Sequence, residues 1–209
     1  MTHTLIIIIV TALVSFSAFN STKVYNDLIM YPPAINRGQW YRLLTSGFIH
    51  ADVMHLGFNM LTLWFFGRLL EEQYFAVQFA HFGSISQYMF LIFYLLGIVV
   101  SDLPTYIKHR NNSSYASLGA SGGVSAVLFA FILLVPWATI YVFVIPVPAI
   151  VFGVLYLVYS QYMSKKGGDN INHDAHFWGA IFGIVALLII DRDTIPRFLE
   201  AIQHPRFDF

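Results

Sequence analysis

Cysteine is absent from this chain of 209 residues, and charged residues are scarce. Without cysteine the protein has no thiol nucleophile, no disulfide and no thiolate ligand for a metal ion. Asp, Glu, Lys and Arg make up 11% of the sequence, whereas soluble domains average about 25%. The formal net charge is zero, which argues against nucleic acid as a partner, because proteins that bind it carry a basic surface.

Long apolar runs fill the sequence instead, and hydrophobic residues make up 57% of it. A helix needs about 20 apolar residues to cross a bilayer, and six segments approach that length. They lie at about 4–20, 53–70, 85–102, 119–135, 147–162 and 174–190. We see no internal repeat or linker. The sequence therefore predicts an all-α polytopic membrane protein, with six transmembrane helices in a single domain over residues 1–209.

The first apolar run could instead be a secretory signal. Such signals begin with a basic segment, whereas this run follows Met1-Thr2-His3-Thr4, which contains neither Lys nor Arg. We therefore expect a retained helix that completes the bundle.

The stretch from Val124 to Tyr162 is uncharged and far too long for a single crossing. Pro136, Pro146 and Pro148 are the expected breaks, because proline lacks the helical N–H and clashes with the preceding turn. The residues between them are β-branched and aromatic, which favours an extended conformation. We therefore expect an extended apolar loop at the membrane interface.

Six spans place three connections on one side of the membrane, at about 21–52, 103–118 and 163–173. Basic residues are more numerous on that side, with seven against four on the other. The seven are Lys23, Arg37, Arg42, Lys108, Arg110, Lys165 and Lys166, and the four are Arg68, Arg192, Arg197 and Arg206. Taken alone, the positive-inside tendency would put the long connections in the cytoplasm.

Polar residues inside the spans form three clusters, and such residues usually mark function. His55 and Asn59 lie four apart on the second span, and so share a helical face. Ser121 follows Gly119 at the start of the fourth span, where backbone N–H groups are free to receive negative charge. His176 lies on the sixth span, one turn before Gly179.

Each cluster also has a structural interpretation, since small residues and intramembrane hydroxyl groups most often serve helix packing. Taken together, however, the three clusters should face one another near one membrane surface. Glycines beside Ser121 and after His176 would let the two helices approach closely. The imidazole could then act as general base for the hydroxyl, and His55 and Asn59 could stabilise an oxyanion.

At these residues the chain resembles the rhomboid family of intramembrane serine proteases, over about residues 37–190. The resemblance is carried by five motifs and by the Pro146-Val147-Pro148 end of the apolar loop. The motifs are Trp40-Tyr41-Arg42; His50, His55 and Asn59; Gly67 and Glu71; Gly119, Ser121 and Gly122; and Ala175, His176, Gly179 and Gly183.

The resemblance implies a catalytic dyad with Ser121 as nucleophile and His176 as general base. It implies an oxyanion hole made by His55, Asn59, Ser121 and Gly119. Structural and packing roles fall to Arg42, Gly67, Glu71, Gly122, Gly179 and Gly183. No cofactor or metal is implied, and the expected partners are the lipid bilayer and membrane proteins with a transmembrane segment. Family topology, against the charge count, implies a bacterial cytoplasmic membrane with the active site facing outward.

Two alternatives stay open. The first is a catalytically silent relative that binds membrane helices, although both dyad residues are present and alanine precedes Ser121. The second is a metal transporter that uses His50, His55, His173 and His176, of which the last two share a helical face. Few acidic residues and no cysteine accompany them, which makes a poor path for zinc.

Overall fold

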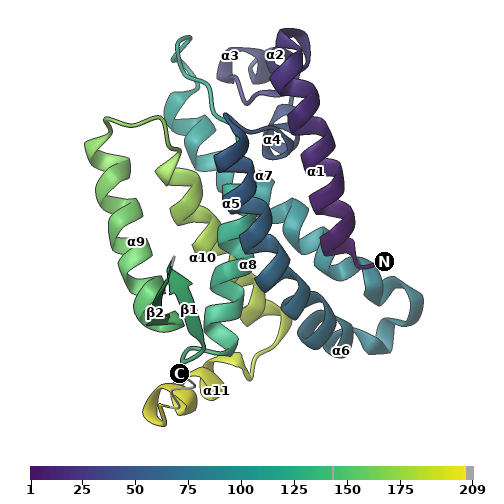
Figure 1. Ribbon diagram of the computed structural model, residues 1–209, viewed down its shortest axis with the longest axis vertical. Helices are drawn as coiled ribbons and strands as arrows, with labels where there is room; N and C mark the ends of the chain where they lie inside the picture. The colour runs from purple at the N-terminus through teal and green to yellow at the C-terminus, as the bar shows by residue number, and fades with distance from the viewer. Residues whose placement is uncertain (143, 206–209) are drawn as a thin grey trace.

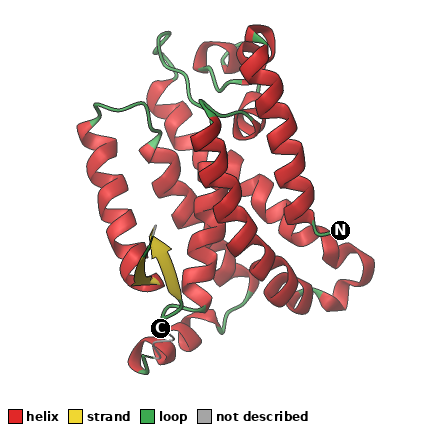
Figure 2. Ribbon diagram, viewed as in Figure 1, coloured by secondary structure: helices red, strands yellow, loops and turns green. Residues whose placement is uncertain are grey.

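The computed structural model describes residues 1–142 and 144–205, and helices dominate it (Figures 1 and 2). The longer helices are α1 (His3–Asn20), α5 (Val53–Thr62), α7 (Met89–His109), α8 (Ser121–Leu134), α9 (Ala149–Lys166), α10 (His173–Ile190) and α11 (Thr194–Gln203). The shorter ones are α2 (Thr22–Leu28), α3 (Pro32–Ile35), α4 (Arg42–Thr45) and α6 (Ala76–Gln78). Turns of 3₁₀-helix cover Ser46–Phe48 and Ala80–Tyr88, and π-helical turns cover Leu63–Gly67 and Leu70–Phe75.

Four helical stretches in the described residues are long and apolar enough to cross a membrane. They are His3–Asn20, Val53–Gln78, Ala80–His109 and His173–Ile190. Helix α8 is apolar but only 14 residues long, and α9 is not among the four. A helical membrane bundle is therefore shown, whereas a count of six spans stays a prediction.

Two helical stretches extend beyond the segments expected to cross the membrane. The second helical stretch does not end near residue 70 but continues through the π-helical turns to Gln78. Helix α7 does not end at residue 102 but runs on to His109, past Asp102 and Pro104. Asp102 is tolerated inside α7 because hydroxyl and amide groups from distant segments bond its carboxylate, and the sequence pattern does not reveal such partners.

The extended apolar loop is confirmed as a two-stranded hairpin of β1 (Thr139–Val142) and β2 (Ile145–Pro148), drawn in yellow in Figure 2. The strands are antiparallel, with Thr139 opposite Pro148. Tyr141 and Ile145 are exposed apolar side chains, as suits a loop at the interface. Phe143, which belongs to the same predicted loop, lies outside the described residues.

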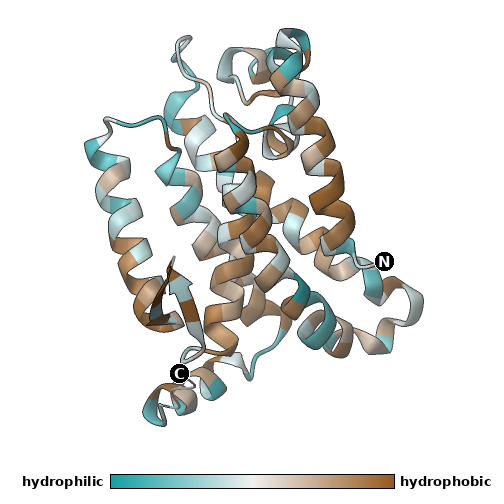
Figure 3. Ribbon diagram, in the orientation of Figure 1, coloured by the Kyte–Doolittle hydropathy of each residue, from teal (hydrophilic) through white to brown (hydrophobic). Residues whose placement is uncertain are grey.

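The three connections that the sequence assigned to one side lie together at one end of the bundle, at the top of Figure 1. Helices α8 and α10 both begin at this end and run downward beside each other. In Figure 3, teal marks many polar residues in the connections at this end and in α11 at the other end. Brown, which marks apolar residues, prevails in the body of α1 and in the lower part of α8. Helix α8 is the central helix, since twelve of its fourteen residues are buried.

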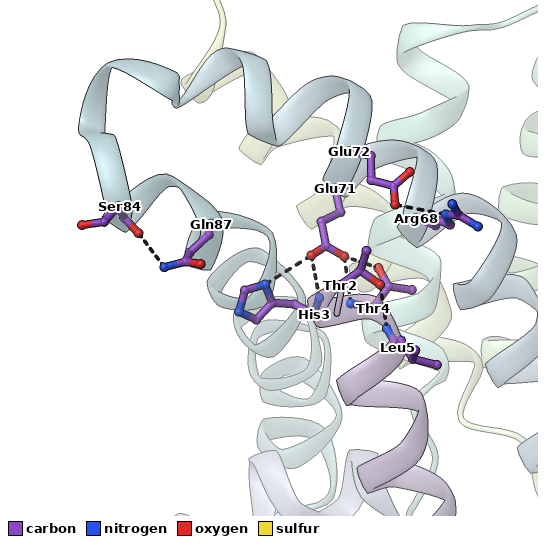
Figure 4. A network of polar contacts seen from close by, with 9 residues as sticks. All are labelled: Thr2, His3, Thr4, Leu5, Arg68, Glu71, Glu72, Ser84 and Gln87. Carbon is purple, nitrogen blue, oxygen red and sulfur yellow. Dashed lines mark hydrogen bonds and ion pairs between the residues drawn. The ribbon is translucent and has the colours of Figure 1, made fainter.

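Helix α1 is attached to the bundle through Glu71, which lies in the second helical stretch (Figure 4). The Glu71 carboxylate accepts bonds from the backbone N–H groups of His3 at 2.6 Å and Thr4 at 2.8 Å. The Thr4 hydroxyl donates to it at 2.7 Å, and the His3 ring lies at 3.2 Å. Glu71 thus satisfies the free N–H groups at the start of α1, where a negative charge is also favoured.

We predict that Glu71→Gln lowers the free energy of unfolding by about 1–3 kcal/mol, because hydrogen bonds to a charged acceptor are replaced by weaker ones. Thermal unfolding in detergent measures the loss. Glu72→Gln is the matched control, because Glu72 forms only an exposed pair with Arg68 at 3.1 Å, and such pairs contribute about 0–1 kcal/mol. Equal losses in the two variants would contradict the assigned role of Glu71.

Candidate active site

Ser121 is the first residue of α8, and the chain that leads to it is held by two backbone bonds. The Gly119 N–H donates to the Ser46 carbonyl at 2.9 Å, and the Ala120 N–H donates to Nε2 of His50 at 3.2 Å. Gly119 has a φ of +117°, which favours glycine. A Cβ there would also lie 2.7 Å from Cε1 of His55. Glycine at 119 therefore sets both the turn and the distance to His55.

The first turn of α8 has backbone N–H groups that are not used in intrahelical hydrogen bonds. Ala120 is the N-cap and forms no side-chain cap, and its carbonyl accepts the first intrahelical bond from Val124 at 3.0 Å. The N–H groups in the first turn have no acceptor within a helix, and they lie at the positive end of its dipole. The Ser121 N–H is therefore suited to stabilise an anion next to the Ser121 hydroxyl.

Helices α8 and α10 touch through their backbones. A Cβ at Gly179 would overlap the carbonyl oxygen of Gly122, and a Cβ at Gly183 would overlap that of Ala126. A Cβ at Gly122 would overlap the Ser101 hydroxyl on α7 and lie 3.6 Å from the Ala175 carbonyl. Gly122 follows Ser121 and Ala175 precedes His176, so the two candidate dyad residues are the chain neighbours of residues in this contact.

The His176 ring is enclosed by other rings. Tyr156 of α9 stacks on it, with centroids 5.9 Å apart and planes at 22°. His173, one turn earlier on α10, meets it edge-on at 5.7 Å. The Tyr156 hydroxyl lies 2.6 Å from Oγ of Ser125, one turn after Ser121. These contacts limit how the imidazole can tilt.

His55 and Asn59 lie beside the same turn. The Asn59 side chain is buried, and its Nδ2 donates to the His55 carbonyl at 2.9 Å. A primary amide carries two N–H donors, so one remains for a ligand. The His55 ring packs against Gly119 and meets the His50 ring edge-on at 4.9 Å. Serine, histidine and amide donors therefore converge on the start of α8.

Comparison with known proteins identifies the family of the chain. The family model described as "Rhomboid domain" matches residues 37–192. The chain belongs to the rhomboid family. The matched residues 37–192 include His55, Asn59, Ser121 and His176.

Several curated rhomboid relatives are similar to the chain. RHOMBOID-like protein 12, mitochondrial, from Arabidopsis thaliana is 30% identical over 178 residues, covering 83% of this chain and 53% of that protein. Rhomboid protease GluP from Bacillus subtilis (strain 168) is 34% identical over 98 residues, covering 47% and 16% respectively. Presenilin-associated rhomboid-like protein A, mitochondrial, from Danio rerio is 30% identical over 146 residues, covering 68% and 35%.

The chain thus spans about half the length, or less, of these curated relatives. Two of their names refer to mitochondria, and a further relative from Arabidopsis thaliana is named chloroplastic. The expectation of a bacterial inner membrane therefore gains no support from them. What they do support is a rhomboid membrane protein.

Some residues of this rhomboid site are not evident from sequence. Tyr156 belongs to an apolar run, and nothing in that run marks it as the ring that stacks on His176. His50 is part of a motif, but its bond to the Ala120 N–H depends on the path of residues 46–52. Its other nitrogen, Nδ1, lies 2.9 Å from the Ser15 hydroxyl of α1.

The residues expected to have packing roles lie outside this convergence, apart from the glycines of α8 and α10. Arg42 is buried and donates to the carbonyls of Asn26 at 2.7 Å and Ile29 at 2.8 Å. It therefore holds the connection between α2 and α4. A Cβ at Gly67 would lie 2.8 Å from Leu63 and 3.3 Å from Thr4, so α1 passes close to the second helical stretch there.

The histidine-lined transporter was the alternative that required a metal. Within residues 1–142 and 144–205, no three His, Asp or Glu side chains gather as ligands of one ion. His173 instead bonds Oδ2 of Asp169 through Nε2 at 3.0 Å. The transporter interpretation therefore has no ligand cluster among the described residues.

We predict that Gly179→Ala destabilises this rhomboid by about 1–3 kcal/mol, because the added methyl group forces two backbones apart. Thermal unfolding in detergent measures it. Gly57→Ala is the matched control, since a Cβ at Gly57 meets nothing within 4 Å and alanine favours the helix. If Gly179→Ala were as stable as Gly57→Ala, the close contact between α8 and α10 would be wrong.

Proposed function

We propose that the protein is an intramembrane serine endopeptidase that cleaves transmembrane or membrane-adjacent segments of membrane proteins. The observation that carries the proposal is the backbone contact between Gly122 and Gly179, which draws the start of α8 towards the start of α10. Membership of a family in which one relative is named a protease supports the reaction class. We also propose that the whole chain forms one membrane domain.

In the proposed reaction, Ser121 Oγ attacks the carbonyl carbon of the scissile bond while its proton passes to a ring nitrogen of His176. The carbonyl electron pair moves to oxygen and gives a tetrahedral oxyanion. When this collapses, the C–N bond breaks and the imidazolium gives its proton to the leaving amine. Water, deprotonated by the same imidazole, then attacks the acyl carbon. The bond from that carbon to Ser121 Oγ breaks, the acid product leaves, and the imidazolium returns the proton to Oγ. Stacking by Tyr156 supports a fixed imidazole, a role that an acidic third residue has in other serine proteases.

We propose that the oxyanion is stabilised by the Ser121 N–H and by the side chains of His55 and Asn59, with Gly119 shaping the turn. The free first-turn N–H of α8 and the unused Asn59 donor support this assignment. Donors fixed in advance are effective because nothing has to reorganise when charge develops.

The alternative is a rhomboid that binds membrane helices without cutting them. The relatives named rhomboid-like leave that possibility, because their names state no activity. The presence of both Ser121 and His176, each next to a residue of the α8–α10 contact, favours the enzyme, since a pure binder has no need of a nucleophile and a base.

We also propose that the end of the bundle carrying the start of α8 faces away from the cytoplasm, with both termini inside. Family topology supports this orientation, whereas the count of basic residues does not. Part of that count is misleading because Arg42 is buried and bonded to backbone carbonyls. The partners proposed are the lipid bilayer and single-span substrates.

We predict that Ser121→Ala abolishes cleavage of a single-span model substrate in proteoliposomes while leaving thermal unfolding unchanged. The reason is that no other group replaces the nucleophile. Ser84→Ala is the control, since Ser84 lies exposed in the turn before α7. Cleavage by the Ser121→Ala protein would exclude this serine as the nucleophile, and a wild type that binds the substrate without cutting it would favour the binder.

Asn59→Ala is expected to lower kcat by about 10²–10³ while KM changes little, as for loss of one oxyanion donor. Steady-state kinetics on the same substrate provide the test. Thr62→Ala is the control, because Thr62 is on the same helix but its half-buried side chain donates to the Phe58 carbonyl at 2.8 Å. An unchanged kcat in Asn59→Ala would contradict the oxyanion role and leave Asn59 with a structural role only.

For orientation, single cysteines at Lys166 and Gln203 can be probed without background, because the chain has no cysteine. An impermeant maleimide applied to intact cells that express each variant should label Lys166→Cys and spare Gln203→Cys. The opposite pattern would show that the charge count, rather than the family topology, gives the correct orientation.

A further inference from the structure

Asp102 of α7 is a buried carboxylate, and it has no cationic partner among the residues that the structure describes. Its residue is 7% exposed, and no Lys, Arg or His among the described residues lies within ion-pair distance of it. Burying such a group is costly unless hydrogen bonds compensate. The two bonds that it accepts therefore indicate why it is present.

The first bond leads to the serine side of the proposed dyad. The Ser46 hydroxyl donates to Oδ2 of Asp102 at 3.1 Å. The carbonyl of the same Ser46 accepts the Gly119 N–H at 2.9 Å. Ser46 thus links Asp102 to the turn that precedes Ser121, so a shift of Asp102 would move that turn.

The second bond leads to the histidine side. Nδ2 of Asn172 donates to Oδ1 of Asp102 at 3.4 Å and to the Ser117 hydroxyl at 2.9 Å. Oδ1 of Asn172 caps α10 by accepting the Ala175 N–H at 3.0 Å, and it also accepts the Thr105 hydroxyl at 3.0 Å. Asn172 therefore fixes the first turn of α10, which carries His176.

We propose that Asp102 is a positioning residue that couples the two halves of the dyad, with one carboxylate oxygen on each side. It touches neither the substrate nor the reacting atoms. The proposal rests on the proposed function for its effect on rate, but the bridge itself is a structural claim. Since Ser121 and His176 lie on different helices, a misplacement of about 1 Å between them can cost roughly 10² in rate.

The bridge, meaning the two hydrogen bonds from Asp102 to Ser46 and Asn172, requires a planar side chain that can form both bonds, but not a negative charge. An asparagine at 102 can accept from Asn172 through its oxygen and donate to Ser46 through its amide, because a hydroxyl group both donates and accepts. A leucine of similar size can do neither. Asp102→Asn should therefore preserve the coupling that Asp102→Leu destroys.

The test combines steady-state kinetics with amide hydrogen exchange, both on the full chain in nanodiscs. Asp102→Leu should lower kcat about 10²-fold with KM nearly unchanged, whereas Asp102→Asn should remain within a few-fold of wild type. Exchange should become faster in Asp102→Leu at residues 117–121 and at 172–176 together. Glu71→Gln is the control, since it changes a different carboxylate, which bonds the first N–H groups of α1, and should alter neither segment.

Full kcat in a folded Asp102→Leu protein would overturn the proposal, and so would an Asp102→Asn protein as impaired as the leucine variant. Faster exchange in only one of the two segments would also overturn it, because the bridge would then not couple them. If Asp102→Leu fails to fold, Ser46→Ala removes one arm alone and should lower kcat about tenfold with exchange faster at both segments. Exchange reports on the bridge even in Ser121→Ala protein, so an inactive wild type would count against the proposed function and not against the bridge.

Discussion

The backbone contact between α8 and α10 is the constraint on which the rest of the site depends. Gly122 and Gly179 meet without side chains between them, and Ala126 and Gly183 repeat the contact one turn further on. In a bilayer there is little hydrophobic drive between helices, so small residues that permit close approach decide which helices pair. The same contact that stabilises the bundle brings the residues next to Gly122 and next to Ala175 together. Packing and chemistry are therefore set by one interaction.

Around this contact, the polar groups are used to fix angles and turns. His50 and Ser46 accept the N–H groups that precede Ser121, and Asn172 caps the helix that carries His176. Tyr156 limits the tilt of the imidazole from a third helix. At the far end Glu71 attaches α1. His50, Asn172 and Glu71 each satisfy donors that the start of a helix leaves free, as the bilayer requires.

The sequence predicts most of this architecture, because hydropathy and proline positions are local signals. They give the helical segments and the extended hairpin, and the spacing of glycines indicates which helices approach. The continuation of α7 to His109 is not evident from the sequence, because Asp102 and Pro104 are unfavourable inside a membrane helix until Ser46 and Asn172 are known to bond the carboxylate. Tyr156 was missed for the same reason, since its contact with His176 depends on how α9 lies against α8. Long-range partners of this kind leave no periodic trace in a single sequence.

The central claim is that Ser121 is a nucleophile whose attack develops negative charge on the substrate carbonyl oxygen beside the first turn of α8. The most direct test is a structure of the protein after reaction with a fluorophosphonate, which would leave a phosphonyl group on the nucleophilic oxygen. The account predicts one adduct, on Ser121 Oγ, with the phosphonyl oxygen facing the Ser121 N–H, Asn59 and His55. An unreacted Ser121 alongside an adduct on another residue, or a phosphonyl oxygen pointing away from these donors, would contradict it.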